Sequence, residues 1–144
     1  MVKVLVICVH NSARSQMGEE YIRKYGGGRF DVESAGLEPG ALNPYVVKVL
    51  AEDGIDISGK PTRDVFELYK AGKRYHYVIT VCSEEAAEKC PLFPGVHEKL
   101  HWPFPDPSAF GGTEDEILAR VREVRDSIQE RVRSFVEEHG NDPY

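Results

Sequence analysis

The fold is decided by residues 2–15, which read VKVLVICVHNSARS. The run from Val2 to Ile7 is apolar and rich in β-branched residues, which is typical of a strand covered on both faces. Cys8 ends this strand and Arg14 opens a predicted helix, so residues 9–13 form a tight connection between a thiol and a guanidinium. A connection of this length can curl so that its backbone N–H groups point inward around an anion. The stretch therefore predicts an oxyanion-binding loop between a buried strand and a helix.

The thiol in this loop has the surroundings of a nucleophile. A helix N-terminus and the Arg14 guanidinium both favour the thiolate form of Cys8, and polar side chains are available to brace the loop. The alternative is that Cys8 merely completes a buried strand, since a cysteine followed six residues later by an arginine also occurs by chance. The predicted binding loop comprises Val9, His10, Asn11, Ser12, Ala13, Arg14 and Ser15.

Strands and helices alternate along the rest of the chain. Apolar periodicity and capping residues predict helices over residues 13–25, 44–54 and 83–89, another beginning near residue 63, and a long one from a Thr113/Glu116 capping box to Gly140. Further strands are expected over residues 30–35, 77–81 and 96–102. The pattern predicts one α/β domain over residues 1–144, a three-layer sandwich with a four-stranded, open, parallel sheet. Ligands of such sheets bind beyond the C-terminal ends of the strands, where Cys8 and Cys82 both fall.

Composition excludes several classes of protein. The formal net charge of −6 argues against a broad basic face for nucleic acid. No apolar run approaches the roughly 18 residues of a membrane helix, and nothing resembles an export signal, so we expect a cytoplasmic protein that binds neither nucleic acid nor membrane. Three cysteines are then reactive thiols, metal ligands or core residues rather than a disulfide framework. A zinc site at Cys8, His10, Cys82 and Cys90 is disfavoured, because no Cys-x2-Cys pair is present.

The chain resembles the low-molecular-weight tyrosine phosphatase superfamily in two motifs. The Cys-x5-Arg-Ser pattern runs from Cys8 to Ser15, and Asp106-Pro107 stands late in the chain. The resemblance implies the fold of that superfamily, with Arg14 holding the oxyanion and Asp106 as the acid that protonates the leaving oxygen. Taken alone, Asp106-Pro107 is also typical of a simple turn.

Two further cysteines resemble the thioredoxin-coupled arsenate reductases of that superfamily. Cys82 follows a predicted strand and Cys90 precedes Pro91, as the redox pair does in that branch. The resemblance implies that Cys8 attacks arsenate, that Cys82 then attacks Cys8 and releases arsenite, and that Cys90 takes over the disulfide for reduction by thioredoxin or a similar dithiol protein. It also implies a role in arsenical resistance, and an oxyanion site that accepts phosphate or sulfate as an analogue.

Two alternatives stay open on the sequence. A low-molecular-weight protein tyrosine phosphatase would use the Cys8 thiolate to form a phosphocysteine that water hydrolyses, and a reductase could retain weak phosphatase activity. A non-catalytic oxyanion-binding or redox-signalling module would use the same loop without chemistry, which the presence of both Arg14 and Asp106 disfavours. The pair Cys82 and Cys90 distinguishes the reductase, since a phosphatase does not need distal thiols.

The chain departs from the arsenate reductase pattern at two places. Residues 83–89 separate Cys82 from Cys90, one residue more than is common, and His10 stands where glycine is common. We expect the His10 position to need an unusual backbone conformation that glycine adopts freely, and favour a role in loop structure over direct catalysis. If residues 83–89 are helical, the Cα atoms of Cys82 and Cys90 lie about 12 Å apart, so a disulfide between them requires this short helix to unwind.

The resemblance further implies a potassium site, because some reductases of this branch hold the ion near the loop. Each candidate ligand could instead be a cap or turn residue. Apart from this ion no tightly bound cofactor is expected, and the protein is expected to be a monomer. The side chains at matching places are Asn11, Glu19, Ser34, Thr62 and Asp64.

Overall fold

Four parallel strands form one sheet in the order β2-β1-β3-β4 in the computed structural model, which describes residues 1–144. The predicted α/β class and four-stranded parallel sheet are confirmed. The strands are β1 (Val2–Cys8), β2 (Phe30–Gly36), β3 (Tyr77–Thr80) and β4 (Glu98–His101). The helices are α1 (Arg14–Gly26), α2 (Pro44–Ala51), α3 (Val65–Lys70), α4 (Glu84–Ala87) and α5 (Glu114–His139), with 3-10 turns at Gly27–Arg29 and Pro107–Ala109.

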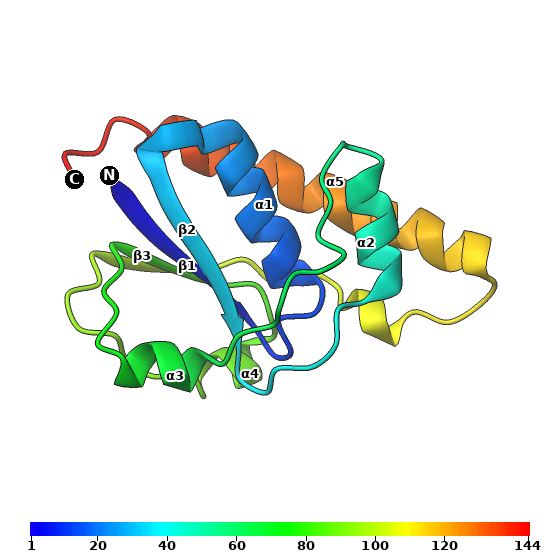
Figure 1. Ribbon diagram of the computed structural model, residues 1–144, viewed down its shortest axis with the longest axis horizontal. Helices are drawn as coiled ribbons and strands as arrows, with labels where there is room; N and C mark the ends of the chain where they lie inside the picture. The colour runs from blue at the N-terminus through cyan, green and yellow to red at the C-terminus, as the bar shows by residue number, and fades with distance from the viewer.

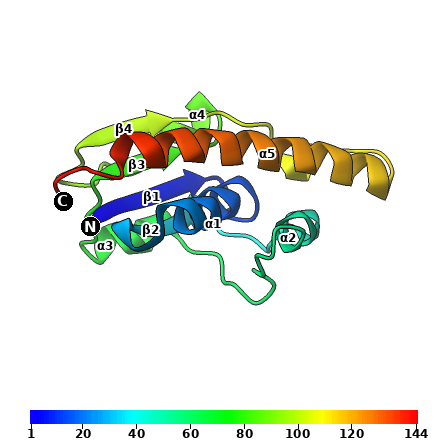
Figure 2. The ribbon, with the colours of Figure 1, turned by 90° about the horizontal axis from the view of Figure 1, so that it is seen from above.

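Helices cover both faces of the sheet and so produce three layers (Figure 1). Alternate residues of β1 point to opposite faces, and Val4 and Val6 join the larger core with buried residues of α1, α2 and α5. Leu5 and Ile7 join a smaller core on the other face, where α3 contributes Val65. Figure 2 shows the long helix α5 running across the molecule beside α1. Because both faces are covered, β1 is apolar along nearly its whole length.

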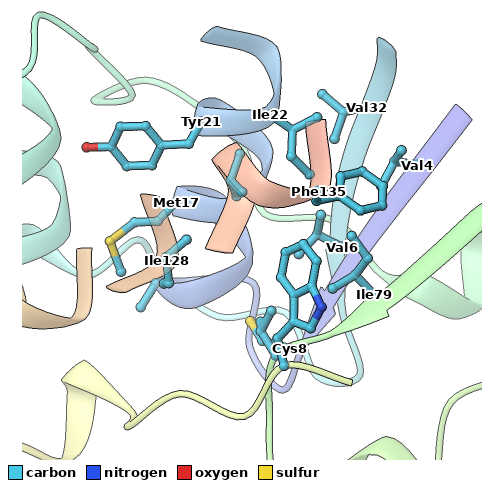
Figure 3. Packing of buried hydrophobic residues seen from close by; sticks show 14 of the residues in the cluster. Val4, Val6, Cys8, Met17, Tyr21, Ile22, Val32, Ile79, Ile128 and Phe135 are labelled. Atoms are coloured by element: carbon cyan, nitrogen blue, oxygen red, sulfur yellow. The ribbon is translucent and has the colours of Figure 1, made fainter. Parts of the chain in front are cut away.

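The C-terminal edge of the sheet carries the first two cysteines. Cys8 is the last residue of β1, where it is in register with Gly36 of β2. Figure 3 shows Cys8 at one end of the packed core, beyond Val6. Cys82 lies two residues after the end of β3. Both thiols therefore lie at the edge where parallel sheets bind their ligands.

Several elements have bounds that differ from those predicted, and α2 ends at Ala51 rather than residue 54. α3 begins at Val65 rather than near residue 63, because the carboxylate of Asp64 caps the helix. β3 ends at Thr80 and β4 spans only Glu98–His101, since the two strands pair over this short register alone. The short helix predicted between the later cysteines is confirmed as α4, and the Ser83 side chain caps it.

The longest helix, α5, follows its predicted capping and periodicity. The hydroxyl oxygen of Thr113 accepts from the backbone N–H of Glu116 at 3.2 Å, which caps the helix, and the same hydroxyl donates to the Glu116 carboxylate at 3.1 Å. One stripe of the helix is buried, at Val121, Val124, Ile128, Val132, Phe135 and Val136. None of the helices is both long enough and apolar enough to cross a membrane.

Candidate active site

The loop between β1 and α1 is anchored through its carbonyl groups. Each carbonyl oxygen from Cys8 to Ser12 accepts a hydrogen bond from outside the loop. With the carbonyl groups turned outward, the peptide N–H groups are free to turn inward. The donors are the backbone N–H groups of Leu37 to Cys8 (3.2 Å), Glu38 to Val9 (2.7 Å), Gly40 to His10 (3.0 Å) and Asn43 to Ser12 (2.9 Å), and the Gln16 side chain to Asn11 (2.9 Å).

The inward N–H groups form a site for an anion. Only the N–H of Asn11 has an acceptor within the protein, the Cys8 sulfur at 3.1 Å, whereas those of residues 9, 10, 12, 13 and 14 donate to no protein group. The N-cap residue of α1, Ala13, also has no capping side chain, although side chains cap α2, α3, α4 and α5. Open N–H groups at a helix N-terminus bind phosphate-like anions. The geometry therefore suits a tetrahedral oxyanion held against the sulfur of Cys8.

The Cys8 thiol is buried and receives hydrogen bonds suited to a thiolate. Its residue is 3% exposed, and the sulfur lies 2.8 Å from the hydroxyl of Ser15 and 3.1 Å from the N–H of Asn11. A thiolate can only accept, so Ser15 donates to it in the charged state. Both donors stabilise negative charge on the sulfur at the place where the oxyanion would sit.

Asn11 has the one left-handed backbone conformation in the loop. It is the only non-glycine residue with a positive φ, 54°, a region that asparagine tolerates better than most residues. Its side-chain NH2 donates to the hydroxyls of Ser15 at 2.7 Å and Ser34 at 2.9 Å, which holds the loop to β2 as well as to α1. The expectation that His10 carries the unusual backbone is therefore wrong, because the left-handed residue is its neighbour.

His10 instead ties the loop to the segment that anchors its carbonyl groups. The side chain is exposed at the rim, and its Nδ1 lies 2.8 Å from the carbonyl oxygen of Glu38. The backbone of the same residue accepts from Gly40. These contacts agree with a role in loop structure.

Gly36 is a site residue that sequence reasoning missed. A Cβ at this position would lie 2.7 Å from the backbone nitrogen of Asn11 and 2.8 Å from the carbonyl oxygen of Val9. Such distances are too short for any side chain, and the obstacle is backbone that cannot easily move. The only feature of the sequence that could have indicated its role is its place directly after a predicted strand. Gln16, which binds the carbonyl of Asn11, was missed as well.

Arg14 and Asp106 meet at the mouth of the loop. The Arg14 side chain is 9% exposed, and its Nη1 donates to the carbonyl oxygens of Phe104 at 3.1 Å and Val81 at 3.4 Å. Its Nη2 lies 3.8 Å from a carboxylate oxygen of Asp106, whose side chain is 40% exposed. The other carboxylate oxygen of Asp106 accepts from the N–H of Ser108, so the residue also caps the turn suggested by the Asp-Pro sequence. The turn aims one oxygen of Asp106 toward Arg14.

The three cysteines are free thiols, and all of them are buried. Cys82 belongs to the larger core and Cys90 to the smaller core on the opposite face of the sheet. Burial raises the pKa of Cys82, and a negative charge on Cys8 raises it further, whereas the Arg14 guanidinium lowers it. Burial raises the pKa of Cys90 to about 11, with a further contribution from a thiolate at Cys82. Cys82 directly follows Val81, whose carbonyl oxygen accepts from Arg14 at 3.4 Å, so this thiol lies beside the loop.

The segment between Cys82 and Cys90 makes hydrogen bonds only within itself, and Ala86 and Ala87 pack against the larger core. Four backbone bonds and the Ser83 cap hold the turns of residues 83–90 together, and none joins residues 83–89 to another element. Only Ala86 and Ala87 are partly buried within residues 83–89. A segment with few external contacts opens at low cost in free energy.

Three of the five predicted potassium ligands converge. The NH2 group of Asn11 donates to the hydroxyl of Ser34, and this hydroxyl donates to the carboxylate of Glu19 at 2.5 Å. Thr62 and Asp64 do not join them, since the hydroxyl of Thr62 donates to the Gly40 carbonyl and Asp64 caps α3.

The converging atoms do not fit a potassium ion. Potassium needs oxygen ligands, but Asn11 presents its NH2 group to Ser34 and turns its oxygen to the backbone N–H of Arg63 at 2.9 Å. The Glu19 carboxylate already has a cation, the Lys60 ammonium group at 2.9 Å. Lys60 is another residue that sequence reasoning missed.

Comparison with known sequences identifies the family that this chain matches. Residues 3–142 match the sequence model of the family described as low molecular weight phosphotyrosine protein phosphatase. An arsenate reductase of Halalkalibacterium halodurans is 41% identical over 134 residues, which cover 93% of this chain and 94% of the relative. An arsenate reductase of Bacillus subtilis is 40% identical over 134 residues, with the same coverage of both chains.

Solved structures agree with the sequence comparison. A structure described as an arsenate reductase in the oxidized state matches with a TM-score of 0.80 at 29% identity, over 96% of this chain and 98% of that chain. Another, described as an arsenate reductase in the phosphate binding state, matches with a TM-score of 0.77 at 30% identity and the same coverage.

Proposed function

The chain belongs to the low molecular weight phosphotyrosine protein phosphatase family, and within it we propose that the protein is an arsenate reductase driven by a relay of three thiols. The observation that carries the proposal is the second thiol. Cys82 is buried at the C-terminal edge of the sheet, directly after Val81, whose carbonyl oxygen accepts from Arg14 of the loop. A hydrolase that releases phosphate from a phosphocysteine has no use for a thiol at that place.

The first step is nucleophilic attack by Cys8 on arsenate. The thiolate forms a sulfur–arsenic bond, one arsenic–oxygen bond breaks, and the departing oxygen takes a proton from Asp106 and leaves as water. The loop N–H groups and Arg14 hold the remaining oxygens as charge builds up on them. The Asp106 oxygen that faces Arg14 at 3.8 Å is suitably placed for this proton transfer.

The second step reduces arsenic. The Cys82 thiolate attacks the Cys8 sulfur, so that a sulfur–sulfur bond forms while the sulfur–arsenic bond breaks. The electron pair of the broken bond stays on arsenic, which leaves as arsenite, and two thiols are oxidised to a disulfide. Arg14 favours the Cys82 thiolate electrostatically and opposes the effect of burial on its pKa.

The third step moves the disulfide outward. Cys90 attacks the Cys82 sulfur and releases the Cys8 thiolate, which restores the first nucleophile. Because Cys90 lies in the core of the opposite face, it must leave that core, and α4 must unwind for the two sulfurs to bond. The local hydrogen bonding of residues 83–89 supports such a movement.

We further propose that reduced thioredoxin, or a similar dithiol protein, restores the enzyme. Leu92, two residues after Cys90, is 74% exposed, which is unusual for a large apolar side chain. Tyr69, 46% exposed, packs edge-on against Phe93, so a second apolar side chain lies near the same segment. All groups of the site come from one chain, which suits a monomer, and a reduced dithiol partner suits the cytoplasm.

The decisive experiment counts free thiols after one equivalent of arsenate in the absence of reductant. The reductase predicts a fall from three thiols to one, whereas a phosphatase or a binding module predicts that all three remain. Cys82→Ser should abolish arsenate turnover yet retain weak hydrolysis of an aryl phosphate, since that reaction needs only the loop and Asp106. Arsenate turnover that survives in Cys82→Ser would refute the relay.

A substitution at Leu92 tests whether thioredoxin docks on this exposed side chain. In Leu92→Ser, the KM for thioredoxin should rise about fivefold because an exposed apolar anchor is lost from the docking surface. Thiol oxidation by a single equivalent of arsenate should be unchanged, which makes that reaction the internal control. An unchanged KM would show that thioredoxin does not use this side chain.

A further inference from the structure

Glu19 is a buried carboxylate in the middle of a polar network under the oxyanion loop. The residue is 5% exposed, and an unpaired charge at such a position would strongly destabilise the fold. It accepts from Ser34 at 2.5 Å and pairs with Lys60 at 2.9 Å and Arg23 at 2.6 Å. The charge of Lys60 is the largest influence that lowers the Glu19 pKa, and together with the hydrogen bonds it outweighs the effect of burial.

Lys60 is held unusually firmly for a lysine. Its ammonium group lies 2.9 Å from both Glu19 and Glu20, and its side chain is 20% exposed. The other lysines in ion pairs, Lys48, Lys70 and Lys73, have side chains that are 46% to 72% exposed. A turn closed by the N–H of Lys60 and the carbonyl of the buried Ile57 presents the side chain.

A continuous chain of hydrogen bonds links this pair to the nucleophile. The hydroxyl of Ser34 donates to Glu19 and accepts from the NH2 group of Asn11 at 2.9 Å. The same NH2 group reaches Ser15 at 2.7 Å, and Ser15 lies 2.8 Å from the Cys8 sulfur. The Glu19 carboxylate can only accept, so the Ser34 hydroxyl must donate to it and is left to accept from the NH2 group of Asn11. The Lys60–Glu19 pair therefore orients Asn11, the residue with the left-handed backbone.

We propose that Lys60 supplies from within the chain the positive charge that orders the oxyanion loop, so that the loop needs no bound potassium ion. An ammonium group offers three N–H donors, and Lys60 pairs with the Glu19 oxygen that Arg23 does not contact. The orientation of Asn11 supports this assignment, since its oxygen is turned away from the Glu19 site to Arg63. Lys60 is in this sense a positioning residue, because it touches no substrate.

The consequence of losing Lys60 follows from the network. Glu19 would retain only Arg23, whose side chain is 48% exposed, and the carboxylate would be free to move. Ser34 and Asn11 would then lose their fixed orientation, and the loop would have to be ordered by the anion itself. The affinity for the oxyanion would then fall, because part of the binding free energy would be used to order the loop.

The experiment measures phosphate binding by calorimetry in potassium chloride and in choline chloride at equal ionic strength. The wild-type protein should bind phosphate equally well in the two salts. Lys60→Met should bind phosphate about tenfold more weakly, and Lys60→Arg, which keeps the charge, should bind within about twofold of the wild type. The matched control is Lys48→Met, which removes an exposed pair with Glu114 and should change nothing.

Two results would overturn the proposal. One is a wild-type protein that binds phosphate more tightly in potassium chloride than in choline chloride, and this arm does not depend on whether a variant folds. The other is a Lys60→Met protein with the phosphate affinity of the wild type. The proposal rests on the oxyanion site of the proposed function, but phosphate binding requires no arsenate turnover, so the relay and the role of Lys60 can fail separately.

Discussion

The loop of residues 8–14 and the segment of residues 82–90 carry the three thiols, and they are held in opposite ways. Five carbonyl groups of the loop are bonded to distant residues or to the helix that follows, whereas residues 83–89 bond only within their own segment. Binding and attack on an oxyanion need donors that are fixed before the substrate arrives. Passing a disulfide from one face of the sheet to the other needs a segment that can leave its place. We call the loop the rigid half and residues 82–90 the mobile half, since the proposed relay would use them for these two different steps.

The largest expected effect lies in the rigid half. Arg14→Lys keeps the charge but loses the planar fork that reaches Phe104, Val81 and the oxyanion, so the rate of arsenate-driven thiol oxidation should fall about 10³-fold. The measurement is a single-turnover count of free thiols against time. Far-UV circular dichroism serves as the control for folding. A rate within tenfold of the wild type would mean that the loop N–H groups alone hold the substrate.

A second substitution tests whether the loop depends on close backbone contact. In Gly36→Ala the new methyl group would lie 2.7 to 2.8 Å from backbone atoms of Asn11, His10 and Val9, so the free energy of unfolding should fall by about 3 kcal/mol and phosphate binding should weaken. The matched control is Gly59→Ala, where nothing lies within 4 Å. Urea unfolding of the two variants measures the difference, and equal stabilities would argue against a tightly packed loop.

The two halves also differ in how far the sequence predicts them. The loop and its nucleophile were predicted because an apolar strand, a cysteine and an arginine are neighbours along the chain, and local capping residues predicted α2, α4 and α5 in the same way. Gly36 and Lys60 were missed because their partners are distant in sequence: the register of β1 and β2 brings Gly36 to the loop, and a turn after α2 brings Lys60 to Glu19. His10 was misjudged because sequence does not reveal which residue of a tight loop becomes left-handed.

A smaller effect is expected in the mobile half. Ser83→Ala removes the cap of α4, which should destabilise that helix by about 1 kcal/mol. Since α4 must unwind in the proposed relay for Cys90 to reach Cys82, formation of their disulfide should be as fast as in the wild type or a few times faster. The measurement uses mass spectrometry to follow hydrogen exchange across residues 83–90 and formation of the Cys82–Cys90 disulfide, in the variant and the wild type, after arsenate treatment. Slower disulfide transfer would mean that an intact α4 guides the reaction.

The smallest effect concerns how Cys90 makes the stability of the fold depend on pH. Burial keeps the Cys90 thiol protonated, whereas hydrogen-bond donors stabilise negative charge on Cys8. Burial raises the Cys90 pKa from an ordinary value of 9.0 to about 11, so the folded protein keeps this proton where the unfolded chain has lost it. Cys90 therefore stabilises the reduced fold fully below pH 9, and this contribution is lost as the pH rises toward 11. Comparing urea unfolding of the wild type and Cys90→Ala across this range should show that the wild type loses about 1 kcal/mol more, after allowance for solvent screening. Parallel pH profiles would mean that Cys90 already reaches water in the reduced protein, in which case the relay would need no movement out of the smaller core.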